Sequence, residues 1–540
     1  MKKSFSWLPF LELIAFLLLG IFGVYASLLA GINYDEAAEF RTYLINMEAI
    51  EGLLNGSSEA YGFLTQYHDR YYGVGFHLFS HGIGFILNQW IGNLLPFSLL
   101  GSRLIWAHAT TFLLFLLSGL LVRACLKLLT RDRLIASLGM FTFLLWPYLF
   151  GHALMNVKDI PFMFAWITCT YIALCIFELP MNFTKPLVMK LVLLGALTGW
   201  LMSIRVSGIL IYIEYFWFAV FWILRNKEDN HVAIPINRLL GLLGVFLFSF
   251  SSALFILYPI LWHNPTELIQ AIVYMASHPW QGNTLTAGEL IEPKTRLFFY
   301  IPAWLMVKLP LFGILGLVVA TFWLVREFLA RKVQARYLGA LVLYFSLLTI
   351  FGLLVIRRVA LYNELRQLIF IAPLLMMLAI VGLNFVSRKL TILILLATSI
   401  MMLLDDIKLH PYQYTYVNEL MRHTDLGGKY ETDYYGLSVK ETARWLNQSQ
   451  IDGQSQCLYV PTKHLWDLEI SPQKFPCVGE FPGDLSLITK PFLFYVHARS
   501  ATGFSAPRGC RLLHAEERIA PLSGTKLQMG ELYQCHSPAS

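Results

Sequence analysis

The chain has 540 residues, of which 57% are hydrophobic and only 14% are charged, and its mean hydropathy is +0.58. This composition excludes a soluble globular protein of the same length and indicates a membrane protein. The formal net charge of +7 is explained by Lys and Arg in loops that face anionic lipid, so it gives no reason to expect a nucleic-acid partner.

The first predicted element is a membrane-spanning helix from Leu8 to Ala30. This apolar run is long enough to cross about 30 Å of hydrocarbon, and Glu12 is its only charged residue. A signal peptide has a shorter apolar core, so we expect the helix to be retained. The stretch AGINYDEAAEF follows, which puts Asp35 and Glu36 directly beyond the end of the helix.

Ten further segments are apolar enough to span a membrane, which predicts about eleven spans in total. They begin near Leu104, Leu134, Pro161, Leu187, Gly208, Leu239, Phe299, Leu338, Leu368 and Leu390. The Lys and Arg residues of the short loops fall on one side if the N-terminus is cytoplasmic. The apolar stretch from Gly73 to Pro96 would break this pattern as a twelfth span, so we expect it to lie at the outer interface.

The composition changes after residue 404, which predicts two domains. Residues 1–404 form an all-α polytopic membrane domain with outer-face loops at 31–102 and 262–298. From 405 to 540, Pro, Gly, Ser and charged residues appear, and short runs such as CLYV and FLFYVHA alternate as strands do. We therefore expect a small exterior α/β domain of ordinary size in this region.

Four of the seven cysteines lie in this predicted exterior domain: Cys457, Cys477, Cys510 and Cys535. An even number of cysteines in an exterior domain indicates disulfides. Pairing of sequence neighbours, Cys457 with Cys477 and Cys510 with Cys535, is the simplest of three possibilities. Four free thiols are the alternative, and the lack of a C-x-x-C spacing disfavours a zinc site.

Acidic residues recur at the predicted outer ends of two spans. Asp35 and Glu36 follow the first span, and Asp159 lies in GHALMNVKDIPF. Pro161 restarts a helix there, so Asp159 is near a helix N-terminus, where the dipole favours an anion. Two carboxylates that face one cavity suit a general base and a second acid that binds an acceptor, a metal or a sugar hydroxyl. Solvated loop carboxylates are the alternative.

Isolated arginines form a second pattern. Arg205 lies between apolar runs, and Arg366 opens a predicted span. Such an arginine needs an anionic partner, and its planar guanidinium matches phosphate well. Internal salt bridges, of Arg205 with Glu214 or of Arg366 with Glu364, are the alternative. A cavity lined by acids and arginines favours a lipid-linked phosphate as the ligand.

These motifs resemble, in order, those of the GT-C glycosyltransferases that use polyprenyl-phosphate sugars, the class that includes protein O-mannosyltransferases and the aminoarabinose transferase of lipid A. The similar blocks are NYDEAAEF, NVKDIPF, IRVSGIL, HPWQG with FFYIPAWLMVKLP, and YNELRQLIFIAPLL, which cover most of residues 30–385. HPYQYTYVNEL followed by KYETDYYGLSVKETARWL resembles a region of a bacterial branch. The chain departs from the class at Gln367, because members often have histidine after the arginine.

The resemblance implies a membrane glycosyltransferase that passes a hexosyl or pentosyl group from a polyprenyl-phosphate donor to a protein, lipid or glycan at the outer face. It implies that Asp35 is the catalytic base with Glu36 beside it, and that Asp159 is the second acid. The residues expected to bind substrate are Lys158, Arg205, Arg366, His278 and Trp280. Backside attack would invert the anomeric centre, and Trp280 could stack on a sugar, although an interfacial tryptophan is the simpler interpretation.

Two other functions stay open at this point. A transporter or flippase for a lipid-linked anionic glycan precursor would show inverted repeats with matching helix breaks, which we do not find. A non-catalytic protein that binds the lipid carrier is the other. We expect a bacterial inner membrane with the C-terminal domain in the periplasm; an endoplasmic reticulum membrane is the alternative. The expected partners are the lipid-linked donor, membrane lipid and the acceptor. The sequence defines no cofactor and leaves a divalent metal ion open.

Overall fold

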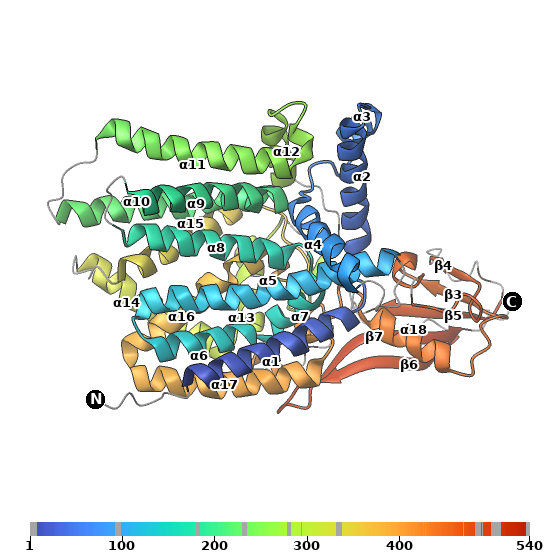
Figure 1. Ribbon diagram of the computed structural model, residues 1–540. Coiled ribbons are helices and arrows are strands. Elements are labelled where there is room, and N and C mark those ends of the chain that lie inside the picture. The colour runs from blue at the N-terminus through green and yellow to red at the C-terminus, as the bar shows by residue number, and fades with distance from the viewer. Residues whose placement is uncertain are drawn as a thin grey trace.

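The structure is a computed structural model that places a bundle of long helices between the N-terminus and a small β-sheet (Figure 1). It describes residues 8–91, 99–179, 184–228, 235–277, 282–292, 294–330, 337–424, 426, 428–467, 469–480, 488, 490–497 and 509–535. We call the end of the bundle that carries the C-terminal sheet the sheet end.

In the described part of the chain, ten helical segments are long and apolar enough to cross a membrane, or eleven if one bent pair counts as a span. The prediction of about eleven spans is therefore confirmed. The helices that form the single spans are α1 (Leu8–Leu29), α5 (Leu99–Thr130), α8 (Asp159–Phe177), α9 (Lys185–Ile204), α10 (Ile211–Glu228), α11 (Ile236–Leu257), α14 (Leu311–Leu329), α15 (Leu338–Ile356), α16 (Ala372–Val386) and α17 (Arg388–Leu409). Three of these helices adjoin a short 3-10 helix: η2 (Val206–Leu210) leads into α10, η3 (Pro259–Leu261) follows α11, and η5 (Arg366–Ile371) leads into α16.

The bent pair consists of α6 (Arg133–Leu144) and α7 (Pro147–Met155), which meet at 58°. Pro147 explains the break, because proline lacks the N–H that a continuous helix would use and clashes with the preceding turn. It stands at the start of α7, where proline is well tolerated. Residues Asn156 to Asp159, which follow α7, line the cavity described below.

The span predicted near Phe299 begins later than expected. Residues Leu297–Lys308 form a separate short helix, α13, and the spanning helix is α14, from Leu311. Leu309, the residue before Pro310, has an extended backbone, the conformation that a following proline favours, so α13 ends there and α14 starts anew. At the other predicted boundary, α17 continues past residue 404 to Leu409.

Several shorter elements lie at the sheet end. These are α2 (Glu36–Leu54), α3 (Glu59–Gln66), α4 (Gly75–Ile91), α12 (Glu267–Ala276) and the antiparallel pair β1 (Thr284–Thr286) and β2 (Glu289–Ile291). Helix α2 projects beyond the bundle and carries α3 at its tip (Figure 1). The stretch from Gly73, which the charge pattern kept out of the spans, forms α4, and α4 is not among the candidate spans.

The C-terminal region forms a five-stranded mixed sheet with α18 (Ser438–Gln448), as the predicted α/β domain requires. The strand order is β4 (Val478–Glu480), β3 (Cys457–Val460), β5 (Phe492–His497), β7 (Lys526–Cys535), β6 (Cys510–Ile519), and the turns η6 (Gln413–Thr415), η7 (Met421–His423) and η8 (Lys463–Leu465) complete it. Strand β3 runs parallel to β4 and β5, whereas β7 is antiparallel to β5 and β6. Disulfides join Cys457 to Cys477 and Cys510 to Cys535, the simplest pairing of the three.

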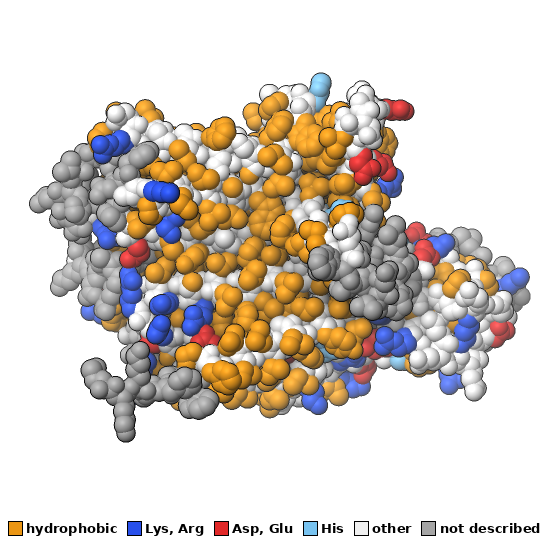
Figure 2. Space-filling view, viewed as in Figure 1, with side chains coloured by type: hydrophobic (Ala, Val, Ile, Leu, Met, Phe, Trp, Pro, Cys, Tyr) orange, Lys and Arg blue, Asp and Glu red, His pale blue; other side chains and the backbone are white. Residues whose placement is uncertain are grey.

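The surface of the bundle matches a membrane environment. Figure 2 shows hydrophobic side chains over the middle of the bundle, Lys and Arg side chains at its end away from the sheet, and charged side chains of both signs on the sheet domain. The exposed apolar residues include Phe248 and Phe322, whose exposed fractions are 77% and 68%. Exposure of so many apolar side chains to water would cost free energy, so this surface fits contact with the lipid of a membrane. The protein is a multi-pass membrane protein.

Candidate active site

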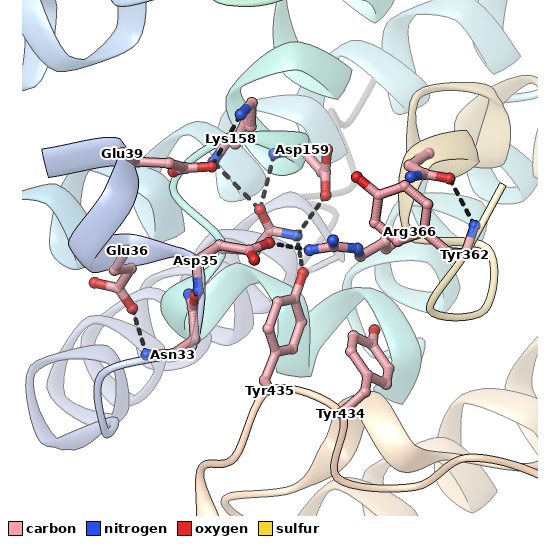
Figure 3. Close-up of polar contacts among 12 residues, drawn as sticks. Asn33, Asp35, Glu36, Glu39, Lys158, Asp159, Tyr362, Arg366, Tyr434 and Tyr435 are labelled. Carbon is pink, nitrogen blue, oxygen red and sulfur yellow. Dashed lines mark hydrogen bonds and ion pairs between the residues drawn. The ribbon is translucent and has the colours of Figure 1, made fainter. Parts of the chain in front are cut away.

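A cavity of about 280 Å³ opens at the sheet end of the bundle. Five residues that the sequence singled out separately line it: Asp35, Lys158, Asp159, Arg205 and Arg366. They come from the starts of α2, α8 and η5 and from the loops before α8 and η2, so the fold gathers distant segments around one space. Figure 3 shows most of these side chains converging.

Asp35 caps the start of α2 and points into the cavity toward Arg366 (Figure 3). Its backbone N–H donates to Asn33 Oδ1 at 2.9 Å, which fixes the loop before the helix. Its carboxylate makes no hydrogen bond to the N–H groups of α2 and accepts one from Arg366 Nη1. The Asp35 side chain is 35% exposed, so solvent reaches this ion pair from one side.

Arg366 is held between two aromatic rings. Its guanidinium carbon lies 5.1 Å from the ring centroid of Tyr362 and 5.5 Å from that of Tyr435, distances at which cation–π attraction acts. The Arg366 side chain is 10% exposed. The alternative partner, Glu364, instead pairs with Lys308 at 2.7 Å, and both of those side chains are buried. The alternative of an Arg366–Glu364 salt bridge is therefore wrong.

Asp159 is the first residue of α8 and pairs with Arg205 through Oδ1. Its Oδ2 accepts from Asn156 Nδ2 at 2.9 Å, and its own N–H donates to Asn156 Oδ1 at 2.9 Å. Only 6% of the Asp159 side chain is exposed. The alternative partner of Arg205, Glu214, is buried and accepts a hydrogen bond from Trp166 Nε1 at 3.1 Å. The Arg205–Glu214 pair is therefore also wrong.

Asn156 connects this acid to the C-terminal region. Backbone N–H groups of Lys158 and Asp159 donate to its Oδ1, which fixes the orientation of the amide. Its Nδ2 therefore faces Asp159 Oδ2, His152 Nδ1 and the Tyr435 hydroxyl, each at 2.9 Å. Tyr435 lies beyond the last span, and its role in this site was missed from the sequence, although its block was noted as a motif.

Lys158 lines the cavity but already has an anionic partner. Its Nζ lies 3.1 Å from Glu39 Oε1 and 4.1 Å from the centroid of the Tyr72 ring. Burial raises the pKa of Glu39, but Lys158 and His77 outweigh this effect and hold the pKa at about 2. Glu39 is therefore ionised at neutral pH and steadies Lys158, a role that the sequence did not suggest.

Glu36 does not line the cavity, in contrast to its expected place beside the base. It is buried, with Oε1 accepting from the Asn33 N–H at 2.9 Å and Oε2 lying 2.8 Å from His108 Nε2. Successive residues at the start of a helix point about 100° apart, so Glu36 turns toward α5 when Asp35 faces the cavity. Asp35 and Glu36 therefore have different surroundings.

The remaining predicted residues give a mixed result. His278 and Trp280 lie outside the described residues. Gln367, where the chain departs from the class, lines the cavity and accepts the Tyr362 N–H at 3.1 Å through Oε1. In the described ranges, no group of three or more His, Cys, Asp and Glu side chains is arranged to hold a metal ion.

The fold and the cavity together define a multi-pass membrane protein with two acid–arginine pairs at the end that carries a small sheet domain.

No protein-family model and no curated protein matches the chain. Among solved structures it is similar to ArnT from Cupriavidus metallidurans, in the apo state (13% identity, 97% of this chain and 98% of that chain, TM-score 0.44) and bound to undecaprenyl phosphate (12% identity, 96% and 97%, TM-score 0.43). It is also similar to the archaeal oligosaccharyltransferase AglB from Archaeoglobus fulgidus in complex with an inhibitory peptide and a dolichol-phosphate (12% identity, 90% and 70%, TM-score 0.44).

Proposed function

We propose that the chain is an integral membrane glycosyltransferase that passes a sugar from a polyprenyl-phosphate donor to an acceptor at the outer face of the membrane. The observation that carries this proposal is the meeting of Asp35 with Arg366 in a cavity that also contains Lys158 and the Asp159–Arg205 pair. A carboxylate that can take a proton and cations that can hold a phosphate are the two parts that such a transfer needs.

The proposed reaction is a single displacement at the anomeric carbon. The acceptor forms a bond to that carbon while the bond from the carbon to the phosphate oxygen breaks, and the acceptor proton passes to Asp35. The donor is a phosphodiester with one negative charge, so the departing polyprenyl phosphate gains a second. Arg366 lies where it can stabilise that growing charge, with Lys158 and Arg205 lining the same cavity. Attack from the side opposite the phosphate inverts the anomeric centre.

The other site residues receive roles that fit their surroundings. Asp159 is held by Asn156 and Arg205, so it suits a fixed contact to a hydroxyl of the sugar or the acceptor. Glu36 supports the loop that presents Asp35 rather than acting on substrate. His278 and Trp280 stay candidates for substrate binding.

A transfer assay tests the proposal. The purified chain in lipid nanodiscs is incubated with radiolabelled polyprenyl-phosphate hexoses and pentoses, with and without acceptor extracts. Transfer or slow hydrolysis of the sugar–phosphate bond in wild-type protein, and its loss in Asp35→Asn, supports the enzyme. Glu48→Gln, a change at an exposed acid on the same helix α2, is the matched control. Movement of donor between the leaflets of proteoliposomes without bond cleavage would instead support the transporter.

The proposal also fixes a topology and a location. We propose a bacterial inner membrane, a cytoplasmic N-terminus and a periplasmic sheet domain, because this places the Lys and Arg of the short loops in the cytoplasm. Reporter fusions after Ser387 and after Gln450 should report opposite compartments, since α17 separates these positions. Two reports from the same compartment would contradict the topology.

A further inference from the structure

The closed ion pair between Asp35 and Arg366 blocks both proposed functions of these residues. The Asp35 oxygen that accepts a hydrogen bond from Arg366 is already occupied, so it is less available to the proton of an acceptor hydroxyl. A guanidinium bound to a carboxylate has less capacity left for phosphate. The pair must therefore open before both residues can act, which raises the question of what opens it.

The two acid–arginine pairs in the cavity differ in how easily they can open. Asp159 is 6% exposed, and Asn156 bonds both its carboxylate and its backbone N–H, so its pair with Arg205 is fixed. Asp35 is 35% exposed, and its carboxylate has no partner other than Arg366 among the described residues. Water reaches the Asp35 end of its pair, so this carboxylate can be rehydrated when it leaves Arg366, whereas the buried Asp159 carboxylate cannot. Asp35 is thus the carboxylate that can leave.

Arg366 stays in place when the carboxylate leaves. The rings of Tyr362 and Tyr435 flank its guanidinium, and its side chain is nine-tenths buried. The Arg366 Nε is buried and has no hydrogen-bond partner in the described part of the chain, while Nη1 donates a hydrogen bond to Asp35. A buried N–H group without a hydrogen-bond partner costs free energy, and an oxygen atom that accepts its hydrogen bond would recover this cost. A phosphate presents several acceptor oxygens and can engage two N–H groups of a guanidinium at once.

We propose that the phosphate of the donor takes the place of the Asp35 carboxylate on Arg366, and that this exchange releases Asp35 to act as the base. The donor then binds before the acceptor, and no free base faces the acceptor until the leaving group is held. This inference rests on the proposed function. The ligand chemistry is a phosphate ester anion, and the headgroup of a polyprenyl phosphate and free inorganic phosphate are its two possible sources.

A binding experiment on the full-length protein in phosphatidylcholine nanodiscs tests the exchange. Undecaprenyl phosphate and inorganic phosphate are titrated separately against wild type, Asp35→Asn and Asp35→Ser, since serine also suits the start of a helix. If the pair is open about one tenth of the time, removing the competing carboxylate strengthens binding about tenfold. Asp69→Asn is the matched control, because Asp69 lines the same cavity but pairs with His68, 2.8 Å away, rather than with an arginine.

The outcomes separate the exchange from the proposed function. Binding about tenfold tighter in both Asp35 variants, with less than about a twofold change in Asp69→Asn, supports the exchange. Equal changes in all three variants, weaker binding in the Asp35 variants, or no binding of either phosphate compound overturns it. Tighter binding of undecaprenyl phosphate alone assigns the site to the lipid-linked source, whereas tighter binding of both assigns it to the phosphate group itself. If wild-type protein shows no transfer while the Asp35 variants bind more tightly, the exchange holds and the glycosyltransferase proposal fails; the reverse result overturns the exchange alone.

Discussion

Asp35 and Glu36 are adjacent in sequence, but substitutions should lower the rate of transfer at Asp35 and the stability of the fold at Glu36. Asp35→Asn keeps the shape of the side chain but cannot accept a proton, and general base catalysis contributes about 10² to 10⁴ in rate. We therefore expect kcat to fall by that factor, equal to about 2.7–5.4 kcal/mol of transition-state stabilisation. Folding should change little, because the Asp35 carboxylate makes no hydrogen bond to its helix.

The effect at Glu36 follows from its two buried contacts. Glu36→Ala leaves the Asn33 N–H and His108 Nε2 without their acceptor, and each buried unsatisfied group costs about 1–3 kcal/mol, so the loss of stability should be about 2–6 kcal/mol. Glu36→Gln should change the stability little. Its amide can accept from the Asn33 N–H and donate to Nε2 of the His108 tautomer that carries its proton on Nδ1, 3.3 Å from the Ser27 carbonyl.

Two assays on each variant distinguish these effects. Thermal unfolding in detergent, followed by the loss of monodisperse protein, reports stability, and single-turnover transfer with excess protein reports chemistry. Loss of transfer in folded Glu36→Gln protein would refute the supporting role of Glu36, since this residue would then act on substrate. A rate above a tenth of the wild-type value in Asp35→Asn would refute the role of Asp35 as the base.

Three further predictions concern ion pairs and disulfides. Because Lys158 and His77 hold the pKa of Glu39 at about 2, below its ordinary value of 4.5, the stabilising effect of the ionised carboxylate is complete above pH 4.5 and is lost as the pH falls toward 2. The pH profile of transfer should therefore show no Glu39 titration between about pH 5 and 9. Glu39→Gln should raise the KM for donor, because the Lys158 ammonium keeps N–H groups for phosphate while it is paired and would lose its fixed position without Glu39. Lys308→Met should cost about 3–5 kcal/mol by leaving buried Glu364 unpaired, and adding Glu364→Met should recover most of that loss in thermal unfolding. Reduction of the bridge that closes a 20-residue separation should cost about 3 kcal/mol, and mass spectrometry that finds all four cysteines alkylated without reduction would contradict both disulfides.

The sequence predicted the spans well because hydropathy is a local property. An apolar run of sufficient length is itself the signal of a spanning helix, and only the stretch from Gly73 had to be judged from the charges of the neighbouring loops. The exceptions are breaks inside long apolar runs, where Pro147 and Pro310 divide segments that the hydropathy pattern joins. Boundaries of this kind depend on single residues and on how the flanking helices pack, so the pattern places them poorly.

The sequence also identified the charged residues of the site but not their partners. The salt bridges considered as the alternative to phosphate binding joined the two arginines to glutamates nearby in sequence, whereas the protein partners in the structure lie 331 residues away for Arg366 and 46 for Arg205. Helical geometry could have separated Asp35 from Glu36, since residues four apart share a face and adjacent residues do not. By that rule Glu39 lies on the same side as Asp35, and both line the cavity.

The composition of the chain changes at the predicted boundary between residues 404 and 405, but residues from both sides of this boundary form the site. Tyr435 accepts the Tyr34 N–H through its carbonyl oxygen at 3.0 Å, accepts a hydrogen bond from Asn156 and flanks Arg366 with its ring. Asp433 fixes the turn that presents Tyr435, since its carboxylate accepts the N–H groups that open α18 at 3.0 and 2.9 Å. Helix α18 packs on the same sheet that the disulfides brace. The sheet domain thus holds one wall of the cavity against the loops that carry Asp35 and Asp159, so the proposed chemistry belongs to both parts of the chain.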